Sequence, residues 1–255
     1  MYWKYGAGCL LAAVVLAGAL PASAAESVCA VRSGAKTVPL VELYTSEGCS
    51  SCPPADRWLS QNAGQNDANW LAFHVDYWDE IGWSDPFGSP AWSQRQRQRV
   101  GAQGGNTVYT PQVMVGSQVQ AEWRSAAQFD RLQRPAQAPG AGLALHLQAM
   151  GGGWQASVGA SRVAGENGDG AQLWLAQYLD GQTSTVRAGE NEGLTLRHDR
   201  VVRRLWGPWP LGNTPLAQSI DVPAQSGNWG LVAFVQDQSG HTLQSLGLAA
   251  AGCGQ

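Results

Sequence analysis

The residues with the clearest chemical potential are two cysteines three positions apart, in the run Cys49-Ser50-Ser51-Cys52. They follow an apolar run at 38–44 and precede a helical pattern that starts near Ala55. At a strand-to-helix junction, free N–H groups and the positive end of the helix dipole stabilise a thiolate and lower a cysteine pKa. We therefore expect Cys49, at the exposed tip, to attack a disulfide and Cys52 to resolve the mixed disulfide.

Two other interpretations use the same pair of cysteines. One is a structural disulfide, and the other is half of a zinc site, which needs four ligands. The further thiols expected to remain after leader removal are Cys29 and Cys253, which an oxidising compartment would claim for a disulfide. The sequence accordingly predicts no bound metal and no organic cofactor.

The dipeptide Thr110-Pro111 stands directly before the apolar run 112–115. In the predicted order of elements, this point lies beside the tip that carries Cys49. A proline there can hold a cis bond and leave the backbone of Thr110 free to pair with a bound peptide. The alternative is an ordinary trans proline at the start of a strand. We assign Pro111 to the catalytic site and Thr110 to substrate binding.

Glu42 is a further candidate, because it lies in the strand that leads to the cysteines. If its side chain points inward, burial would raise its pKa and allow it to relay a proton to Cys52. The alternative is an exposed glutamate near the end of a strand.

The long segment 76–105 carries several tryptophans, including Trp78 and Trp83, together with four acidic residues. We expect this segment to face the substrate over Cys49, with the two tryptophans as anchors for a peptide. With His74 its acids could bind a metal instead, but no ligand spacing recurs. A self-packed loop is the third interpretation.

Residues 1–24 have the form of a signal peptide, with Lys4, an apolar stretch at 10–20 and a small-residue cleavage site at 22–24. The apolar stretch is too short to cross a bilayer, although an uncleaved anchor is the alternative. We expect a periplasmic or secreted protein with no membrane span after cleavage. In that compartment Cys29 and Cys253 would form a structural disulfide that ties the second half of the chain to the first.

The remaining chain divides by its periodicity. A short N-terminal segment, 25–37, precedes 38–134, which reads β-α-β-α-β-β-α with a hairpin partner at 118–123 and indicates a mixed sheet of the α/β or α+β class. A Pro- and Gly-containing linker, 135–142, leads to 143–255, where short alternating runs predict an antiparallel β-sandwich.

Longer motifs carry a family resemblance. The stretch 41–56 reads VELYTSEGCSSCPPAD, and 74–79, 83–87 and 108–112 read HVDYWD, WSDPF and VYTPQ. They resemble an exported bacterial family catalogued as domain of unknown function 1223, over essentially the whole chain after the leader. The resemblance implies a thioredoxin-like domain. The wider thioredoxin-like class implies disulfide exchange, with Cys49, Cys52 and Pro111 in the roles given above.

The composition of the chain limits the classes of partner that it could bind. The 255 residues carry 16 basic and 19 acidic side chains, a net charge of −3, which disfavours nucleic-acid binding. We therefore predict an exported thiol–disulfide exchange protein that acts on protein thiols or disulfides. The alternative is a non-catalytic binding module on the same scaffold, with a structural Cys49–Cys52 disulfide. A thiolate site for a soft metal is a third hypothesis. The sequence leaves the oligomeric state open.

Overall fold

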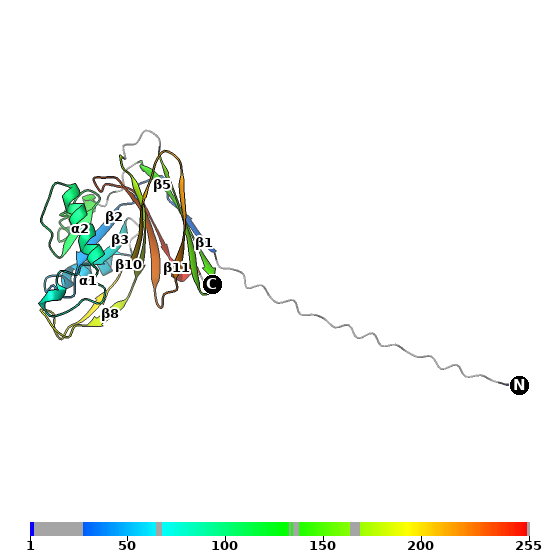
Figure 1. Cartoon of the computed structure of the whole chain (residues 1–255), viewed down its shortest axis with the longest axis horizontal. Coiled ribbons are helices and arrows are strands. Elements are labelled where there is room, and N and C mark those ends of the chain that lie inside the picture. Colours follow the sequence, from blue (N-terminus) through cyan, green and yellow to red (C-terminus); the bar gives the residue numbers. More distant parts are fainter. Residues whose placement is uncertain (3–27, 65–67, 133, 135–137, 164–168, 254–255) are drawn as a thin grey trace.

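The structure is a computed structural model that describes residues 1–2, 28–64, 68–132, 134, 138–163 and 169–253. All but the first two residues of the predicted signal peptide lie outside this range, as does part of the predicted linker. The described chain is a sheet-rich mixed fold in which helices α1 and α2 lie at the end of the molecule that holds β2 and β3 (Figure 1).

The order of elements begins with one strand that the sequence did not indicate, followed by alternating strands and helices. In chain order the elements are β1 (Val28–Arg32), β2 (Leu40–Thr45), α1 (Pro53–Asn62), β3 (Asn69–His74), η1 (Asp79–Ile81), α2 (Pro90–Ala102), β4 (Gln112–Val115), α3 (Ala126–Leu132), β5 (Ala141–Met150), β6 (Gly153–Arg162), β7 (Gln172–Leu179), β8 (Gln182–Thr185), β9 (Thr195–His198), β10 (Val201–Pro210), β11 (Leu216–Pro223), β12 (Trp229–Gln236), β13 (Thr242–Ala249) and η2 (Ala250–Gly252).

Three sheets organise these strands. The largest has the order β13-β12-β7-β10-β3-β2-β4, the second has β1-β5-β6-β11, and β8 pairs with β9. Strands β2 and β3 are parallel, and β4 is antiparallel to β2. The junction between β10 and β3 is parallel, with Val201 opposite Ala72. Strands from both sides of the predicted linker 135–142 therefore belong to one sheet.

The pattern of apolar residues along each strand determines which of its faces is packed against another sheet or a helix. Along β5 every second residue from Ala141 to Leu147 is buried, and these side chains pack between the four-stranded sheet and β7, β12 and β13. The two neighbouring sheets thus share one core, as period-two alternation predicts. At the other end of the large sheet, α1 and α3 cover one face of β2, β3 and β4, and α2 covers the opposite face.

Helix starts follow their local chemistry. Helix α1 begins at Pro53, two residues before the predicted start, because the first turn tolerates residues without a free N–H. Helix α2 begins at Pro90, and the Ser89 hydroxyl accepts a hydrogen bond from the Ala91 amide as its N-cap. These two starts fix the direction of both helices relative to β2 and β3.

The predicted hairpin strand at 118–123 is wrong. One bridge forms there, between Val115 and Gln118, and a single further backbone bond joins the Ala121 amide to the Val113 carbonyl at 2.9 Å, so no regular strand results. A buried side chain replaces a strand partner: the amide of Gln112 donates to the Val119 carbonyl at 2.8 Å. Trp123 then packs against Trp58 beside α1. The edge at β4 is therefore covered by side chains and a few backbone bonds, and not by a further strand.

Cys29 and Cys253 form the expected disulfide, with Cα atoms 5.3 Å apart. The expectation that it ties the second half of the chain to the first is wrong. Cys29 lies on β1, which pairs with β5, and Cys253 follows β13. Both cysteines pack on the core between the two sheets. The bond therefore joins the two ends of the described chain within one layered unit.

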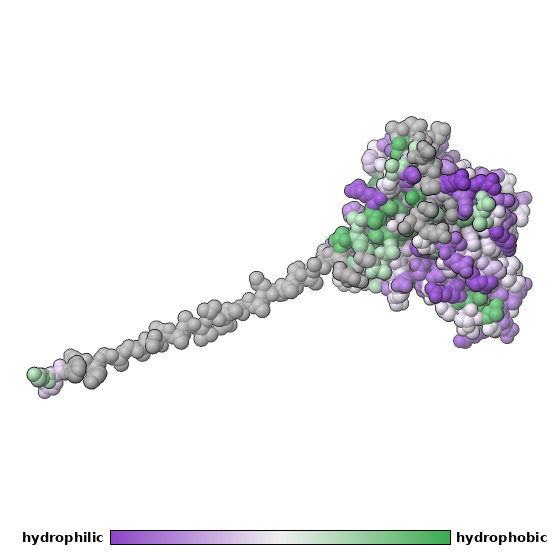
Figure 2. Space-filling model, turned by 180° about the vertical axis from the view of Figure 1, so that it is seen from behind, coloured by the Kyte–Doolittle hydropathy of each residue, from purple (hydrophilic) through white to green (hydrophobic). Residues whose placement is uncertain are grey.

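Hydrophilic side chains cover most of the face shown in Figure 2, and apolar ones gather in small groups. The large sheet instead buries its apolar residues, and every residue of β12 is buried. Among the described residues, no helix is long and apolar enough to cross a membrane.

Candidate functional site

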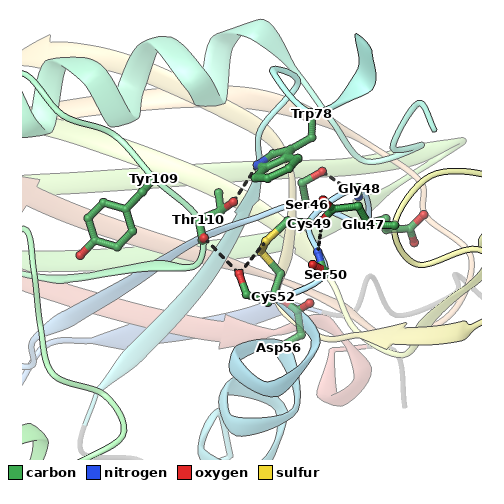
Figure 3. The surroundings of a disulfide bond; sticks show 12 residues. Ser46, Glu47, Gly48, Cys49, Ser50, Cys52, Asp56, Trp78, Tyr109 and Thr110 are labelled. Atoms are coloured by element: carbon green, nitrogen blue, oxygen red, sulfur yellow. Dashed lines mark hydrogen bonds between the residues drawn. A yellow bond between two sulfur atoms is a disulfide. The ribbon is translucent and has the colours of Figure 1, made fainter. Parts of the chain in front are cut away.

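The Cys49–Cys52 pair lies between the end of β2 and the start of α1 and is bonded, with Cα atoms 5.4 Å apart (Figure 3). Cys52 is the N-cap of α1, and its carbonyl accepts the amide of Asp56. Both cysteines have no exposed surface, whereas Ser50 and Ser51 between them are exposed. The expectation of an exposed Cys49 is therefore wrong in the disulfide form. The reason is that segments from elsewhere in the chain close over it.

The first of these segments contains Thr110 and Pro111, whose peptide bond is cis. The Ser51 hydroxyl donates to the Thr110 carbonyl at 3.4 Å and lies 3.4 Å from the Cys49 sulfur. The indole of Trp78 donates to the Thr110 hydroxyl at 2.7 Å, as Figure 3 shows. The tertiary structure therefore brings Pro111, Thr110 and Trp78 to the cysteine pair, as the sequence analysis expected.

The second segment is the loop 189–193, which joins β8 to β9. Asn191 is buried there, and its amide donates to the carbonyls of Glu47 and Cys49 at 2.8 and 3.0 Å. The exposed carboxylate of Glu190 accepts the backbone amide of Ser50 at 3.0 Å. A loop more than 130 residues away in sequence thus holds the backbone on both sides of Cys49.

A buried cluster of five titratable residues lies beneath the cysteine loop. His74 pairs with Asp85 at 2.7 Å, and His198 pairs with Glu47 at 3.1 Å and lies 3.8 Å from Asp56. The two imidazole rings meet edge to face, with centroids 4.8 Å apart. We call Glu47, Asp56, His74, Asp85 and His198 the acid–histidine cluster.

Burial and pairing oppose each other in this cluster. Burial favours the neutral imidazole of His74, but the Asp85 carboxylate outweighs it and raises the His74 pKa. Burial alone would raise the pKa of Asp85, yet His74 and backbone amides lower it. Burial is the dominant effect on Asp56 and raises its pKa despite the nearby histidines. His74 and Asp85 therefore form a buried ion pair, while Asp56 binds a proton more readily than an exposed aspartate.

Glu42 is buried, the first of the two alternatives, but the rise of its pKa predicted for that case is wrong. Burial would raise it, but Arg95 and Arg99 together lower the pKa to about 2. Arg95 binds both carboxylate oxygens at 3.0 Å, and Gln236 donates to the same group. A carboxylate held ionised by two arginines is not a proton relay for Cys52. Glu42 instead links β2 to α2 and β12.

Trp83 turns toward the interior of the molecule. Its indole donates to the Glu47 carboxylate at 2.8 Å, so its polar end serves the acid–histidine cluster. Asp79 likewise turns inward, accepting the amide of Asp85 and the hydroxyl of Ser84. In the part of the chain that the structure describes, no three of the histidine, cysteine, aspartate and glutamate side chains are arranged to hold a metal ion.

Sequence reasoning missed several residues of this site. Asp56 carried a usable signal, because it lies four residues after Cys52 and therefore on the same face of α1. The stretch 187–193, which includes Glu190 and Asn191, was part of the family resemblance, but no local pattern places it or His198 beside a loop in the first half of the chain. The pairing of β10 with β3 and the packing of β9 on α1 bring that region to the cysteines.

Two solved structures share this sheet-rich fold. A crystal structure of protein AGR_C_4864 from Agrobacterium tumefaciens is 24% identical, covers 85% of this chain and 96% of its own, and has a TM-score of 0.60. HBP35 of Porphyromonas gingivalis is 12% identical, with 85% and 76% coverage and a TM-score of 0.59. At these identities the likeness concerns the fold alone. No curated protein matches the chain.

The sequence that surrounds the site, and that forms the large sheet before and after the predicted linker, identifies the family. Residues 40–236 match the family described as protein of unknown function (DUF1223). Since this range spans most of the chain and contains the cysteine pair, Thr110, Pro111 and the loop 189–193, the chain belongs to that family. The resemblance seen in the motifs around Cys49 is thereby confirmed.

Proposed function

We propose that this protein exchanges disulfides with protein thiols through Cys49 and Cys52, on a thioredoxin-like arrangement of β2, α1, β3, α2 and β4. The observation that carries the proposal is the position of Thr110. Its carbonyl lies beside the Cys49 sulfur, bridged to it by the Ser51 hydroxyl. A partner peptide could replace the Ser51 hydroxyl as donor to this carbonyl and bring its own sulfur to Cys49.

The proposed exchange reaction balances in atoms and electrons without a cofactor. A partner thiolate attacks the Cys49 sulfur, the Cys49–Cys52 bond breaks, and Cys52 leaves as a thiolate that takes up a proton. A second partner thiolate then attacks the partner sulfur of the mixed disulfide and releases Cys49 as a thiolate. The partner is oxidised to a disulfide and the Cys49–Cys52 pair is reduced. The reverse sequence reduces a partner disulfide.

Access to Cys49 requires local movement, because the sulfur is covered in the disulfide form. The cover consists of few contacts that involve exposed residues. The Ser51 hydroxyl contacts and the Glu190 bond to Ser50 both lie at the surface. Surface hydrogen bonds of this kind contribute about 1 kcal/mol each. Their exchange for contacts with a partner would remove this exposed part of the cover at small cost, while the buried Asn191 bond to the Cys49 carbonyl is kept.

The proposal includes export to an oxidising compartment. The signal-like segment at 1–24 and two disulfides in the described chain support it. There the Cys29–Cys253 bond would persist, and the partners would be exported proteins with free thiols or disulfides.

Replacement of the resolving cysteine tests the exchange activity. We expect purified Cys52→Ser protein to form a stable mixed disulfide with a disulfide-containing peptide, because the attack occurs and the resolving step does not. Non-reducing electrophoresis and intact mass measure the adduct. In the matched Cys49→Ser protein the remaining thiol is Cys52, the N-cap of the helix, and we expect little adduct. Equal adduct in both variants, or none in Cys52→Ser, would contradict the proposal.

A second candidate function is a binding module with a structural Cys49–Cys52 disulfide. The observation that favours it is the complete burial of both cysteines, since buried cysteines are commonly inert. It predicts that neither single-cysteine variant traps a partner, so the same experiment separates the two candidates.

A further inference from the structure

The loop 189–193 places a negative charge at the cysteine pair. Glu190 accepts the amide of Ser50, the residue directly after Cys49, at 3.0 Å. The bond to Ser50 lowers the Glu190 pKa, so the carboxylate is ionised at neutral pH. Asn191, its buried neighbour, holds the Cys49 carbonyl and thereby fixes the loop against the cysteine turn. The charge is therefore fixed beside Cys49 by two independent contacts.

This position is the one at which a helix start would otherwise help a thiolate. Free amides and the positive end of the helix dipole lower the pKa of a cysteine there. Glu190 binds the amide of Ser50, which precedes the helix cap Cys52, and so places a like charge beside the Cys49 thiolate that opposes it. Burial of the cysteine acts in the same direction.

Other charged groups also surround the pair. The residues beneath it belong to β2, β3, α1, β9 and the segments that adjoin them. They combine carboxylates with imidazoles, so their signs partly cancel: Glu47, Asp56, His74, Asp85 and His198. Glu190 differs from them because it is exposed and binds a neutral backbone amide, that of Ser50. Its charge can be changed without breaking a buried pair.

We propose that Glu190 is a positioning residue for the proposed exchange reaction, and that its carboxylate opposes the Cys49 thiolate and makes the Cys49–Cys52 disulfide a weaker oxidant. A destabilised thiolate disfavours the reduced form of the pair, and the reduction potential of the disulfide becomes more negative. The effect of Glu190 on disulfide exchange rests on the proposed function. Its effect on the Cys49 pKa concerns the reduced protein and does not depend on exchange.

The test compares Cys52→Ser protein with the Cys52→Ser, Glu190→Gln double variant. In protein prepared without residues 1–24, which contain Cys9, Cys49 is the free thiol in both variants, since Cys29 and Cys253 are bonded. Glutamine can still accept the Ser50 amide, so the loop contact is kept while the charge is removed. Far-ultraviolet thiolate absorbance, followed against pH, reports the Cys49 pKa. We expect the pKa to fall by about 0.5 in the double variant, the effect of one charge a few ångströms away through solvent.

The matched control is Glu192→Gln, an exposed glutamate two residues along the same loop. We expect it to leave the Cys49 pKa unchanged and Glu190→Lys to lower it further than Glu190→Gln. The difference should shrink in about 1 M salt, where charges are screened beyond about 3 Å. In protein with both cysteines, equilibration with glutathione should give a less negative reduction potential for Glu190→Gln.

An unchanged or raised Cys49 pKa in the Glu190→Gln background would overturn the inference, as would an equal fall in Glu192→Gln. The titration needs no partner protein, so it is independent of the trapping experiment. A shifted pKa without a trapped adduct would reject the exchange function and keep the electrostatic role of Glu190. A trapped adduct without a shift of the Cys49 pKa would support the exchange function and reject the electrostatic role of Glu190.

Discussion

Two buried glutamates close to the cysteines have different surroundings and different uses. Glu42 faces two arginines, and the Arg95 guanidinium also lies over the rings of Phe73, Trp174 and Phe234 at 5.2 to 5.4 Å. Glu47, five residues later, accepts hydrogen bonds from neutral donors and pairs with His198. Residue type therefore does not decide the role of a buried carboxylate. The charge of its neighbours does.

The lowered Glu42 pKa predicts how stability depends on pH. Because the pKa falls from 4.5 to about 2 on folding, the unfolded chain takes up this proton first. The stabilisation is complete above pH 4.5 and is lost as the pH falls toward 2, by roughly 3 kcal/mol in total. Carbon NMR of the Glu42 carboxyl group measures this directly, and a midpoint near 4.5 would contradict it.

A stability measurement gives a second readout of the same effect. Urea unfolding between pH 5 and pH 2 should show a smaller loss for Glu42→Gln than for the wild type, although the variant is less stable at neutral pH. Glu80→Gln is the control, because Glu80 is exposed. The loss for Glu80→Gln should equal that of the wild type.

At the scale of elements, the β8–β9 hairpin connects the second half of the chain to the cysteine turn. Its loop contributes Asn191 and Glu190, and β9 contributes His198 to the acid–histidine cluster. Helix α1 packs against β9 as well as β2. The Cys49–Cys52 pair is thus enclosed by elements from both halves of the sequence, and its surroundings depend on a hairpin inserted between β7 and β10.

Removal of the Asn191 amide tests this dependence. In Asn191→Ala two buried carbonyls, those of Glu47 and Cys49, lose their side-chain donor. We expect a loss of about 1–3 kcal/mol in unfolding free energy and faster amide exchange in residues 46–52. Asn106→Ala, at an exposed loop position, is the control. Equal stability of the two variants would show that the loop does not hold the cysteine turn.

At the scale of the whole molecule, the large sheet joins the two halves of the chain. The predicted division at 135–142 falls between α3 and β5, yet β10 lies beside β3. The Cys29–Cys253 bond links β1 of the four-stranded sheet to the end of β13 of the large sheet, and both cysteines pack on the core between these sheets. A disulfide with a sequence separation of 224 constrains nearly all of the described chain.

Removal of each disulfide should therefore have unequal effects on stability. In the chain-entropy account, a long closed loop contributes about 2–5 kcal/mol, and a short one contributes less. We expect Cys29→Ala with Cys253→Ala to lower the unfolding free energy by that amount. Cys49→Ala with Cys52→Ala, whose separation is three, is the matched control and should lose less. Urea unfolding measures both, and the reverse order would refute the expectation.

The sequence determined the local features of the site. Cys49 and Cys52 before a proline-led helix, Pro111 before β4 and the period-two runs of β5 and β6 are each set by neighbouring residues, so local pattern was sufficient. It failed for the strand predicted at 118–123, where the backbone makes only isolated bonds to β4 and the buried Gln112 side chain binds the Val119 carbonyl. It also missed β1 and β10, whose partners lie far away in sequence.

Tertiary structure alone decided the electrostatics and the enclosure of the site. Whether Glu42 is ionised depends on Arg95, and whether Cys49 is covered depends on Asn191 and Glu190. Charge interactions and burial act over distances in space, and no spacing in the chain encodes which distant segments will meet. The sequence by itself therefore identified Cys49 and Cys52 as the candidate site, and the fold set the charges and contacts around them.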